Sequence, residues 1–475
     1  MKAERSRSHS RPSPPPLSHK GRGALWRDCG MAMQAEARPW KRSIGWLLLL
    51  GPFFFASYGF ATWVTSQRAH VGVLVFGWER TLIPFWPWTI VPYWLIDLLY
   101  GLSLLLCATR IHLDNHAKRL LTAQVVAVSS FLFFPLRFSF ERAHVDGAFG
   151  WMFDTLAVFD KPFNQAPSLH IALLVLLWVV YLRALPLAWH WLVHGIFALI
   201  GVSVLTTWQH HFFDVPTGLW LGWFCLWLFP DAVQAPLSHA TWSRDPARRR
   251  LGFLYALAAL LLTTIALLVG GAALWLLWVG AALGLVALAY LMFGAAAFQK
   301  RADGSLSPAS RWLLAPYVWG AWINSRLWTR GLNRADAVVP GLLLGRIPRR
   351  AELDSLDIAA IVDVSAELPC TPGARAYANV PMLDLLPPGA DQIARAVTAI
   401  TAASQSGTVL VCCALGFSRS ALAVAAWLLA TQRANSPDDA LAQVRQARPA
   451  IVLGPAQTAA LDVWWNQHSC GTIRA

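Results

Sequence analysis

Apolar runs of about twenty residues recur before residue 300 of this 475-residue chain. A run of that length is long enough to cross the hydrocarbon core of a bilayer as a helix. Over the whole chain 56% of the residues are hydrophobic and only 13% are charged, and the charges gather between the apolar runs. The sequence therefore predicts a multi-pass α-helical membrane domain rather than a string of soluble domains.

Eight runs qualify as membrane spans, and the last two meet at a tight Gly270-Gly271 turn. The fourth and the sixth are short, and we expect each to extend by a few residues. The predicted spans are Ile44–Val64, Trp88–Ala108, Leu120–Leu136, Ile171–Leu182, Trp191–Trp208, Val215–Leu228, Leu251–Gly270 and Ala272–Ala297. They define a polytopic domain over residues 38–298, after an Arg-, Ser- and Pro-rich basic extension at 1–37 that we expect to be disordered.

Basic residues fall on one side of this eight-span arrangement. Cytoplasmic loops of membrane proteins carry an excess of Lys and Arg, so this side is predicted to be the cytoplasm and the membrane a cell inner membrane. The residues are Arg38, Lys41, Arg42, Arg110, Lys118, Arg119, Arg183, Arg244, Arg248, Arg249, Arg250, Lys300 and Arg301. Most of the net charge of +14 belongs to this pattern and to the N-terminus, and we expect no nucleic-acid partner.

A second feature lies near the C-terminus, where Cys413 precedes Arg419 by six positions and Ser420 follows directly. The apolar run 408–411 is typical of a buried strand, and the pattern at 421–432 is typical of a helix. The loop between them therefore meets a helix N-terminus, where unpaired amides and the helix dipole favour an anion. A thiol in that field loses its proton readily and becomes a nucleophile, and an Arg side chain can hold two phosphoryl oxygens.

This stretch resembles the signature of the cysteine-dependent protein tyrosine and dual-specificity phosphatases, and the resemblance extends over about 333–465. It implies a cytosolic α/β domain over residues 333–475. It also implies Cys413 as nucleophile, Arg419 and Gly416 in phosphate binding, Ser420 in breakdown of the phosphocysteine, and Asp384 as general acid. The family usually has His before the nucleophile. Here that position is Cys412, which suggests a vicinal disulfide or a partner for a sulfenate.

Polar segments at the ends of the predicted spans point to a second site. They contain Arg137, then Ser168 and His170, then His210 and Asp214, and the eight-span arrangement places all of them on the outer side. Two imidazoles can serve as nucleophile and general acid in phosphoryl transfer. An Asp four residues after a His can fix the tautomer of its ring, and an Arg can hold the phosphate. Neither this site nor the cysteine site requires a metal or cofactor.

These segments resemble the membrane type 2 phosphatidic acid phosphatase superfamily, most of all its branch related to inositolphosphoryl-ceramide synthases, over about 86–228. The resemblance implies a six-span core with His210 as nucleophile, Asp214 orienting it, His170 protonating the leaving oxygen, and Ser168 and Arg137 binding phosphate. Two positions depart from the family. Leu169 replaces a usual Gly, and Val204 replaces an Arg for which Lys161 or Arg142 are candidate substitutes.

The segment between the two predicted domains, 299–332, mixes aromatic residues with arginines. This composition predicts an amphipathic helix on the inner leaflet, with a plain tether as the alternative. The sequence thus predicts a bifunctional membrane phosphatase whose partners are the membrane and phosphorylated lipids, and phosphoproteins remain open as partners. The alternatives are a headgroup transferase at the histidine site, and a cysteine domain that is regulatory, directed at proteins, or inactive and phosphate-binding.

Overall fold

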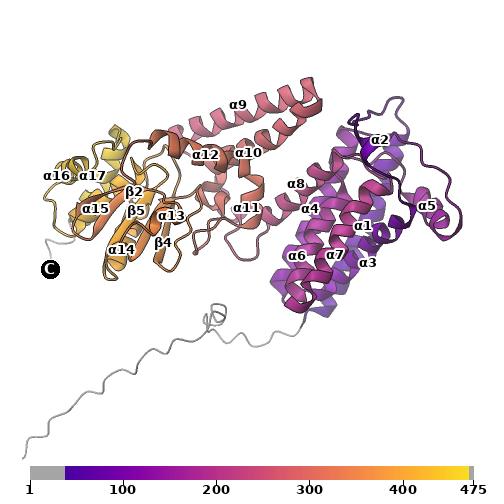
Figure 1. The fold of residues 1–475 in the computed structure, drawn as a ribbon, viewed down its shortest axis with the longest axis horizontal. Coiled ribbons are helices and arrows are strands. Elements are labelled where there is room, and N and C mark those ends of the chain that lie inside the picture. Colours follow the sequence, from indigo (N-terminus) through magenta and orange to yellow (C-terminus); the bar gives the residue numbers. More distant parts are fainter. Residues whose placement is uncertain (1–37, 470–475) are drawn as a thin grey trace, which may run out of the picture.

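The computed structural model describes residues 38–469, so the predicted extension at 1–37 lies outside the described residues. A helical bundle forms the N-terminal part and an α/β domain forms the C-terminal part, as the orange-to-yellow segment of Figure 1 shows. Each predicted span coincides with a helix. These helices are α1 (Trp40–Ser66), α3 (Ile90–Leu106), α4 (Arg110–Phe133), α6 (Leu169–Ala184), α7 (His190–Thr206), α8 (Asp214–Leu228), α9 (Pro246–Val269) and α10 (Leu276–Leu288).

Five stretches of the described residues are long and apolar enough to cross a membrane, whereas eight were predicted. They are Trp40–Ser66, Pro87–Leu106, Leu187–Thr206, Pro246–Val269 and Gly271–Phe298. The helices α6 and α8 have only 16 and 15 residues, and α4 is interrupted by charged residues in its first half. The helix α6 contacts α3, α4, α7 and α8 and is largely buried, so its apolar surface faces protein on most sides.

The loops of the bundle gather at two opposite ends. At one end, isolated β-bridges join Gly72 to Leu136 and Leu136 to Asn164, beside the short helices α2 (Glu79–Leu82) and α5 (Gly147–Phe159). At the other end, Asp231 binds Arg119 and Arg183, so the loop after α8 is held to α4 and to the end of α6. Successive long helices of the bundle therefore run in alternating directions.

The helices α9 and α10 form a hairpin whose turn has Gly270 and Gly271 at φ 66° and 54°, a conformation that favours glycine. A π-helical turn η5 (Ala289–Phe293) and a 3-10 turn η6 (Gly294–Phe298) follow α10. Most of the α9 surface is apolar and exposed. Its exposed large side chains are Phe253, Leu254, Leu257, Leu260, Leu261, Ile265, Leu267, Leu268 and Val269.

The linker departs from the single helix predicted over 299–332. It contains two helices, α11 (Pro308–Leu313) and α12 (Ala315–Trp328), and aromatic side chains such as Trp312, Trp319 and Trp328 are exposed. Lys300 was interpreted as a charge at the membrane edge. Its side chain instead lies in the protein interior and is only 1% exposed. There its Nζ atom forms an ion pair with Asp363, 2.5 Å from Oδ2.

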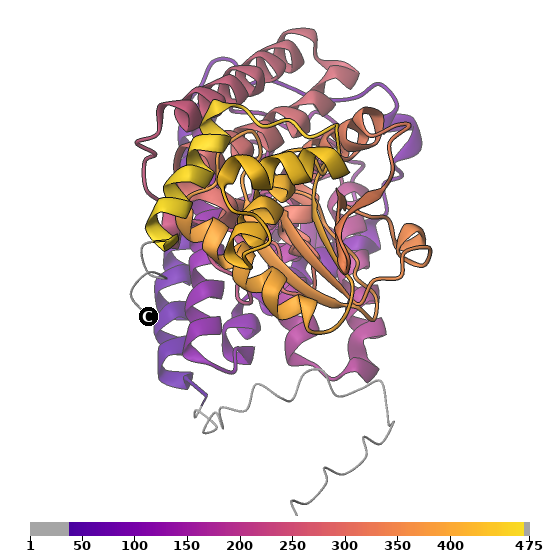
Figure 2. The same ribbon diagram turned by 90° about the vertical axis from the view of Figure 1, so that its left-hand side faces the viewer.

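The C-terminal domain contains a five-stranded sheet of order β1-β2-β5-β3-β4, which bears out the predicted α/β fold of this domain. The strand β1 is antiparallel to β2, and the other pairs are parallel. The strands are β1 (Ala335–Val339), β2 (Leu342–Arg346), β3 (Ala360–Ser365), β4 (Ala376–Met382) and β5 (Val409–Cys413). The helices are α13 (Arg350–Leu353), α14 (Ala390–Ser404), α15 (Arg419–Ala430), α16 (Pro437–Ala447) and α17 (Pro455–Ser469). Figure 2 shows the C-terminal helices in front of the sheet.

The central strand β5 is buried over its whole length, since both faces of the sheet are covered. Val409, Val411 and Cys413 belong to a core with α14, α15 and α17, whereas Leu410 and Cys412 belong to a core that includes side chains of α12. The alternation of side chains along a strand explains this division. The carboxyl end of β5, where ligands bind in sheets of this kind, leads directly into the loop before α15.

Candidate active sites

The loop from Cys413 to Arg419 wraps around the sulfur of Cys413. The backbone N–H of Gly416 and the hydroxyl of Ser420 both donate to Cys413 Sγ, each over 3.2 Å. Cys413 ends β5 and Arg419 begins α15, so the sulfur faces a helix N-terminus, as the sequence predicted. Backbone and hydroxyl donors and the positive end of the helix dipole therefore converge where a negatively charged phosphoryl group would lie.

Gly416 is required by the backbone of this loop. Its φ is 74°, and a Cβ atom there would lie 2.4 Å from the carbonyl carbon of Gly345 on β2. The loop therefore packs directly against the neighbouring strand, and this close approach turns the amide of Gly416 toward the sulfur. The predicted role of Gly416 in phosphate binding depends on this amide.

The guanidinium of Arg419 is buried, with 2% of the residue exposed, and it is held by a carboxylate that the sequence analysis missed. Glu367 accepts two hydrogen bonds from it, at 2.7 and 2.9 Å, and the carbonyl of Met382 accepts a third at 2.9 Å. Burial raises the pKa of Glu367, but the adjacent Arg419 outweighs this effect and holds that pKa below its usual value. Glu367 follows β3 at the same sheet edge as the cysteine loop. This position directly after a predicted strand is the sequence signal from which Glu367 could have been proposed as a residue of the site.

Asp384 lies two residues beyond β4 and reaches the same guanidinium, with Oδ1 3.0 Å from Nη2 of Arg419. Its side chain keeps 32% of its surface exposed, unlike that of Glu367. Burial is the main cause that raises the pKa of Asp384, and the negative charge of Glu367 adds to it, while Arg419 opposes both. The result is a carboxyl group beside the phosphate-binding Arg that retains its proton to higher pH than an ordinary Asp.

Cys412 points away from this site into the opposite core, beside Leu410 and Cys370. Burial raises the pKa of its thiol well above the usual value. Cys412 and Cys413 are both free, and their side chains leave opposite faces of a regular strand. This geometry does not fit the vicinal disulfide that the sequence suggested.

At the far end of the bundle, three predicted residues come together: His210, Asp214 and Ser168. The Nδ1 atom of His210 lies 3.0 Å from Oδ2 of Asp214, and its Nε2 atom lies 3.2 Å from Oγ of Ser168. Asp214 is the first residue of α8, and Ser168 caps α6 by accepting from the backbone N–H of Ile171. All three of the interacting side chains are buried, so the ring is fixed at both nitrogens.

His170 lies in the first turn of α6, close enough to His210 for an electrostatic interaction. Its ring stacks on Tyr93, with 4.1 Å between ring centroids, and its buried Nε2 atom has no hydrogen-bond partner among residues 38–469. The neighbouring carboxylate of Asp160 accepts from the hydroxyls of Tyr58 and Tyr93. A free imidazole nitrogen at this position can exchange a proton with a ligand.

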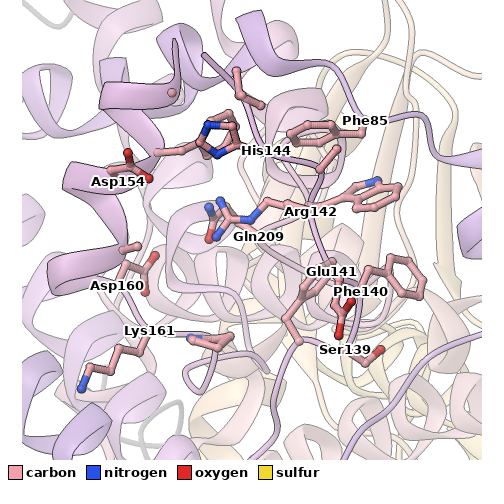
Figure 3. Close-up of a pocket in the computed structure, with 18 of the residues that line it drawn as sticks. Phe85, Ser139, Phe140, Glu141, Arg142, His144, Asp154, Asp160, Lys161 and Gln209 are labelled. Carbon is pink, nitrogen blue, oxygen red and sulfur yellow. The ribbon is translucent and has the colours of Figure 1, made fainter. Parts of the chain in front are cut away.

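The predicted phosphate-binding Arg137 lines a cavity of about 650 Å³ at the same end. Figure 3 shows Arg142, Asp160, Lys161 and Gln209 around this cavity. Arg142 and Lys161, the two substitutes proposed from the sequence for the Arg that Val204 replaces, both line this cavity, and Gln209 directly precedes His210. The structure gives Arg137 no direct contact with His210 among the described residues.

His211 is engaged elsewhere, which separates it from its neighbour His210. Its Nδ1 atom lies 2.9 Å from Oε2 of Glu79, and its Nε2 atom accepts from the backbone N–H of Ser139. Burial raises the pKa of Glu79, but its hydrogen bonds to His211 and to backbone amides lower that pKa below the usual value. Glu79 was not predicted from the sequence, because it lies among aromatic residues without a recognisable motif.

A family model described as "Dual specificity phosphatase, catalytic domain" matches residues 345–467. The match covers the strands β3, β4 and β5, the cysteine loop and Asp384. The C-terminal domain is therefore a dual-specificity phosphatase catalytic domain. The chain that carries it is a phosphatase, which hydrolyses phosphoric monoesters.

Several solved structures are similar to part of the chain. One is titled "Crystal structure of Tk-PTP in the active form", with 25% identity and a TM-score of 0.27, covering 28% of this chain and 97% of that one. Human DUSP28 has 25% identity and a TM-score of 0.27, covering 29% and 99%. PTPMT1 in complex with PI(5)P has 18% identity and a TM-score of 0.28, covering 30% and 99%. No curated protein matches the chain.

Proposed function

We propose that the chain is a bifunctional membrane phosphatase with two separate sites for phosphate esters. At the cysteine site, Cys413 Sγ attacks phosphorus while the bond to the leaving oxygen breaks and Asp384 gives that oxygen its proton. Water then displaces the sulfur, Asp384 takes a proton from the water, and phosphate leaves. Arg419 holds the phosphoryl oxygens throughout, and the hydroxyl of Ser420 stabilises the departing thiolate. The observation that carries this proposal is the pair of hydrogen bonds from Gly416 and Ser420 to Cys413 Sγ.

At the histidine site, Nε2 of His210 is the proposed nucleophile because Asp214 occupies Nδ1. Asp214 holds the ring in one tautomer and stabilises its positive charge when phosphohistidine forms. His170 protonates the leaving oxygen, and Ser168 contacts the phosphoryl group. The bases of this proposal are the contacts that Asp214 and Ser168 make with His210 and the neighbouring cavity, whose lining includes Arg137, Arg142 and Lys161.

The proposed substrates are phosphorylated lipids in an inner membrane. Soluble proteins rarely expose continuous apolar surface on the scale of α9, where only Gly252 and Ala266 are buried, so a bilayer is the expected neighbour of this helix. The histidine cluster lies at the end of the bundle opposite the Asp231 ion pairs. We therefore place the histidine site on the outer side and the cysteine domain in the cytoplasm, each at a membrane surface.

The test is phosphate release by the detergent-purified full chain from a panel of phosphorylated lipids. Wild type is compared with Cys413→Ser and His210→Ala, and each has a matched control. Cys412→Ala removes the adjacent thiol on the other face of β5, and His116→Ala removes a buried histidine paired to Ser103 elsewhere in the bundle.

The proposal predicts that each active-site variant loses a different part of the panel while both controls keep all of it. Loss of the whole panel in either variant would contradict two independent sites. If the histidine-dependent part appears only after an alcohol acceptor is added, that site is a transferase rather than a hydrolase.

A further inference from the structure

Both catalytic loops of the cysteine site accept a hydrogen bond from a hydroxyl group outside the sheet domain. The hydroxyl of Tyr290, in η5 beyond α10, donates to the backbone carbonyl of Asp384 over 3.0 Å. The hydroxyl of Ser325, on α12, donates to the backbone carbonyl of Ala414 in the cysteine loop over 2.5 Å. Tyr290 and Ser325 are fully buried, so water does not compete for either bond.

Apolar packing extends these two contacts into an interface. Leu386, two residues after Asp384, and Ala366, just before Glu367, belong to the same buried cluster as Tyr290 and Leu314. The ring of Tyr290 is stacked on Tyr255 of α9, with 5.4 Å between centroids. The loop that carries the proposed acid therefore rests on the helical hairpin and the linker, rather than on its own sheet alone.

The residue after the proposed acid has a strained backbone. Leu385 has a φ of 59° and lies 63% exposed, so its side chain does not bury enough surface to offset this conformation. Strain of this kind persists only where surrounding contacts fix the backbone on both sides. On one side the carbonyl of Asp384 is fixed by Tyr290, and on the other Leu386 is fixed by packing.

We propose that Tyr290 is a positioning residue for Asp384, so that the helical hairpin sets the general-acid step of the cysteine site. The inference rests on the proposed role of Asp384. Without the hydroxyl, the Asp384–Leu385 peptide is free to rotate out of its strained conformation, and the carboxyl group moves away from Arg419 and the leaving oxygen. Small displacements of a catalytic group are costly to rate because proton transfer requires hydrogen-bond contact.

The test uses the full chain in detergent, in a His210→Ala background that silences the proposed second site. Two substrates are compared, 4-nitrophenyl phosphate and a soluble alkyl phosphate. A nitrophenolate leaves without a proton, whereas an alkoxide requires one, so only the alkyl ester depends on a well-placed acid. Asp384 also acts in breakdown of the phosphocysteine, which is the same for both esters, so the rates compared are kcat/KM, which report only the steps up to P–O bond cleavage. We expect Tyr290→Phe to lower kcat/KM for the alkyl ester about tenfold and to change kcat/KM for the aryl ester less than about twofold.

The matched control is Tyr181→Phe, which removes a buried hydroxyl donating to the carbonyl of Leu99 within the bundle, and it should change neither rate. Equal loss on both esters with Tyr290→Phe, or no loss on either, would overturn the inference. The variant Asp384→Asn tests the proposed acid separately from the role of Tyr290. If Asp384→Asn slows the alkyl ester no more than the aryl ester, Asp384 is not the acid and the proposed function of this residue is wrong. If Asp384→Asn slows the alkyl ester selectively and Tyr290→Phe does not, only the inference about Tyr290 fails.

Discussion

Replacing Lys300 by Met removes one partner of a fully buried ion pair and should lower the stability of the C-terminal domain. The Nζ atom lies 2.5 Å from Oδ2 of Asp363, and Asp363 is 0% exposed. At an effective dielectric constant of about 20 the attraction at that distance is about 7 kcal/mol, most of which offsets the desolvation of the two charges. Removing only the Lys leaves a buried carboxylate, which typically costs about 3–5 kcal/mol. Remaining donors, Tyr377 and Ser365, favour the lower end of this range.

The assay is urea unfolding of the full chain in detergent, followed by hydrogen exchange of peptides from β3 and β5. This local signal reports on the C-terminal domain even where the bundle does not unfold with it. The double variant Lys300→Met/Asp363→Leu removes both charges, so it should recover most of the lost free energy. The exposed Lys41→Met serves as control, with an expected change within about 0.5 kcal/mol.

Two outcomes would refute this reasoning. A cost below about 1 kcal/mol for Lys300→Met would mean that solvent reaches the carboxylate, so that the pair is not buried in solution. A double variant less stable than Lys300→Met would mean that the remaining hydrogen bonds to Asp363, rather than the charge pair, stabilise this position.

Four further outcomes are expected. Gly416→Ala should abolish release of 4-nitrophenol by the cysteine site, because a positive φ costs a non-glycine residue about 1–2 kcal/mol and the new methyl group meets Gly345; circular dichroism checks that the variant folds. The rate on an alkyl phosphate should fall as pH rises through the raised pKa of Asp384, because the acid must be protonated. Asp384→Asn should remove that limb of the pH–rate profile and lower the rate about 10²-fold. Cys412→Ala should keep turnover and lose about 1 kcal/mol of stability, measured by thermal unfolding, because it leaves a small cavity.

Local patterns predicted the parts of the molecule that depend on nearby residues. Cys413 and Arg419 were found from their spacing, because a strand, a tight loop and a helix N-terminus are all encoded within a short stretch. The helix predicted at 421–432 was displaced by two residues, since α15 begins at Arg419. The contact of His210 with Asp214 also depends on nearby residues, since the two lie only four positions apart, whereas the role of this cluster stays a prediction.

Contacts between distant residues were not predictable in the same way. Glu367 reaches Arg419 across 52 positions, and the partner of a buried charge depends on how the strands and loops pack. Lys300 was assigned to the membrane edge by a rule that counts charges in loops, and such a rule does not detect a carboxylate supplied by β3. The sequence also did not predict whether α6 and α8 are long enough to span a membrane. A helix that is surrounded by other helices is apolar on all sides even when it is too short to cross a bilayer.

The orientation of Cys412 has a consequence for the enzyme under oxidative stress. Peroxide converts a reactive thiolate to a sulfenic acid, and a nearby second thiol normally rescues it by forming a disulfide. Among residues 38–469 the neighbouring thiols, Cys412 and Cys370, both lie in the core on the other side of β5 from Cys413. As far as the thiols of residues 38–469 are concerned, rescue therefore depends on thiols supplied from solution. Phosphatase activity lost to brief peroxide exposure should return only with such a thiol, and prolonged exposure should oxidise Cys413 irreversibly.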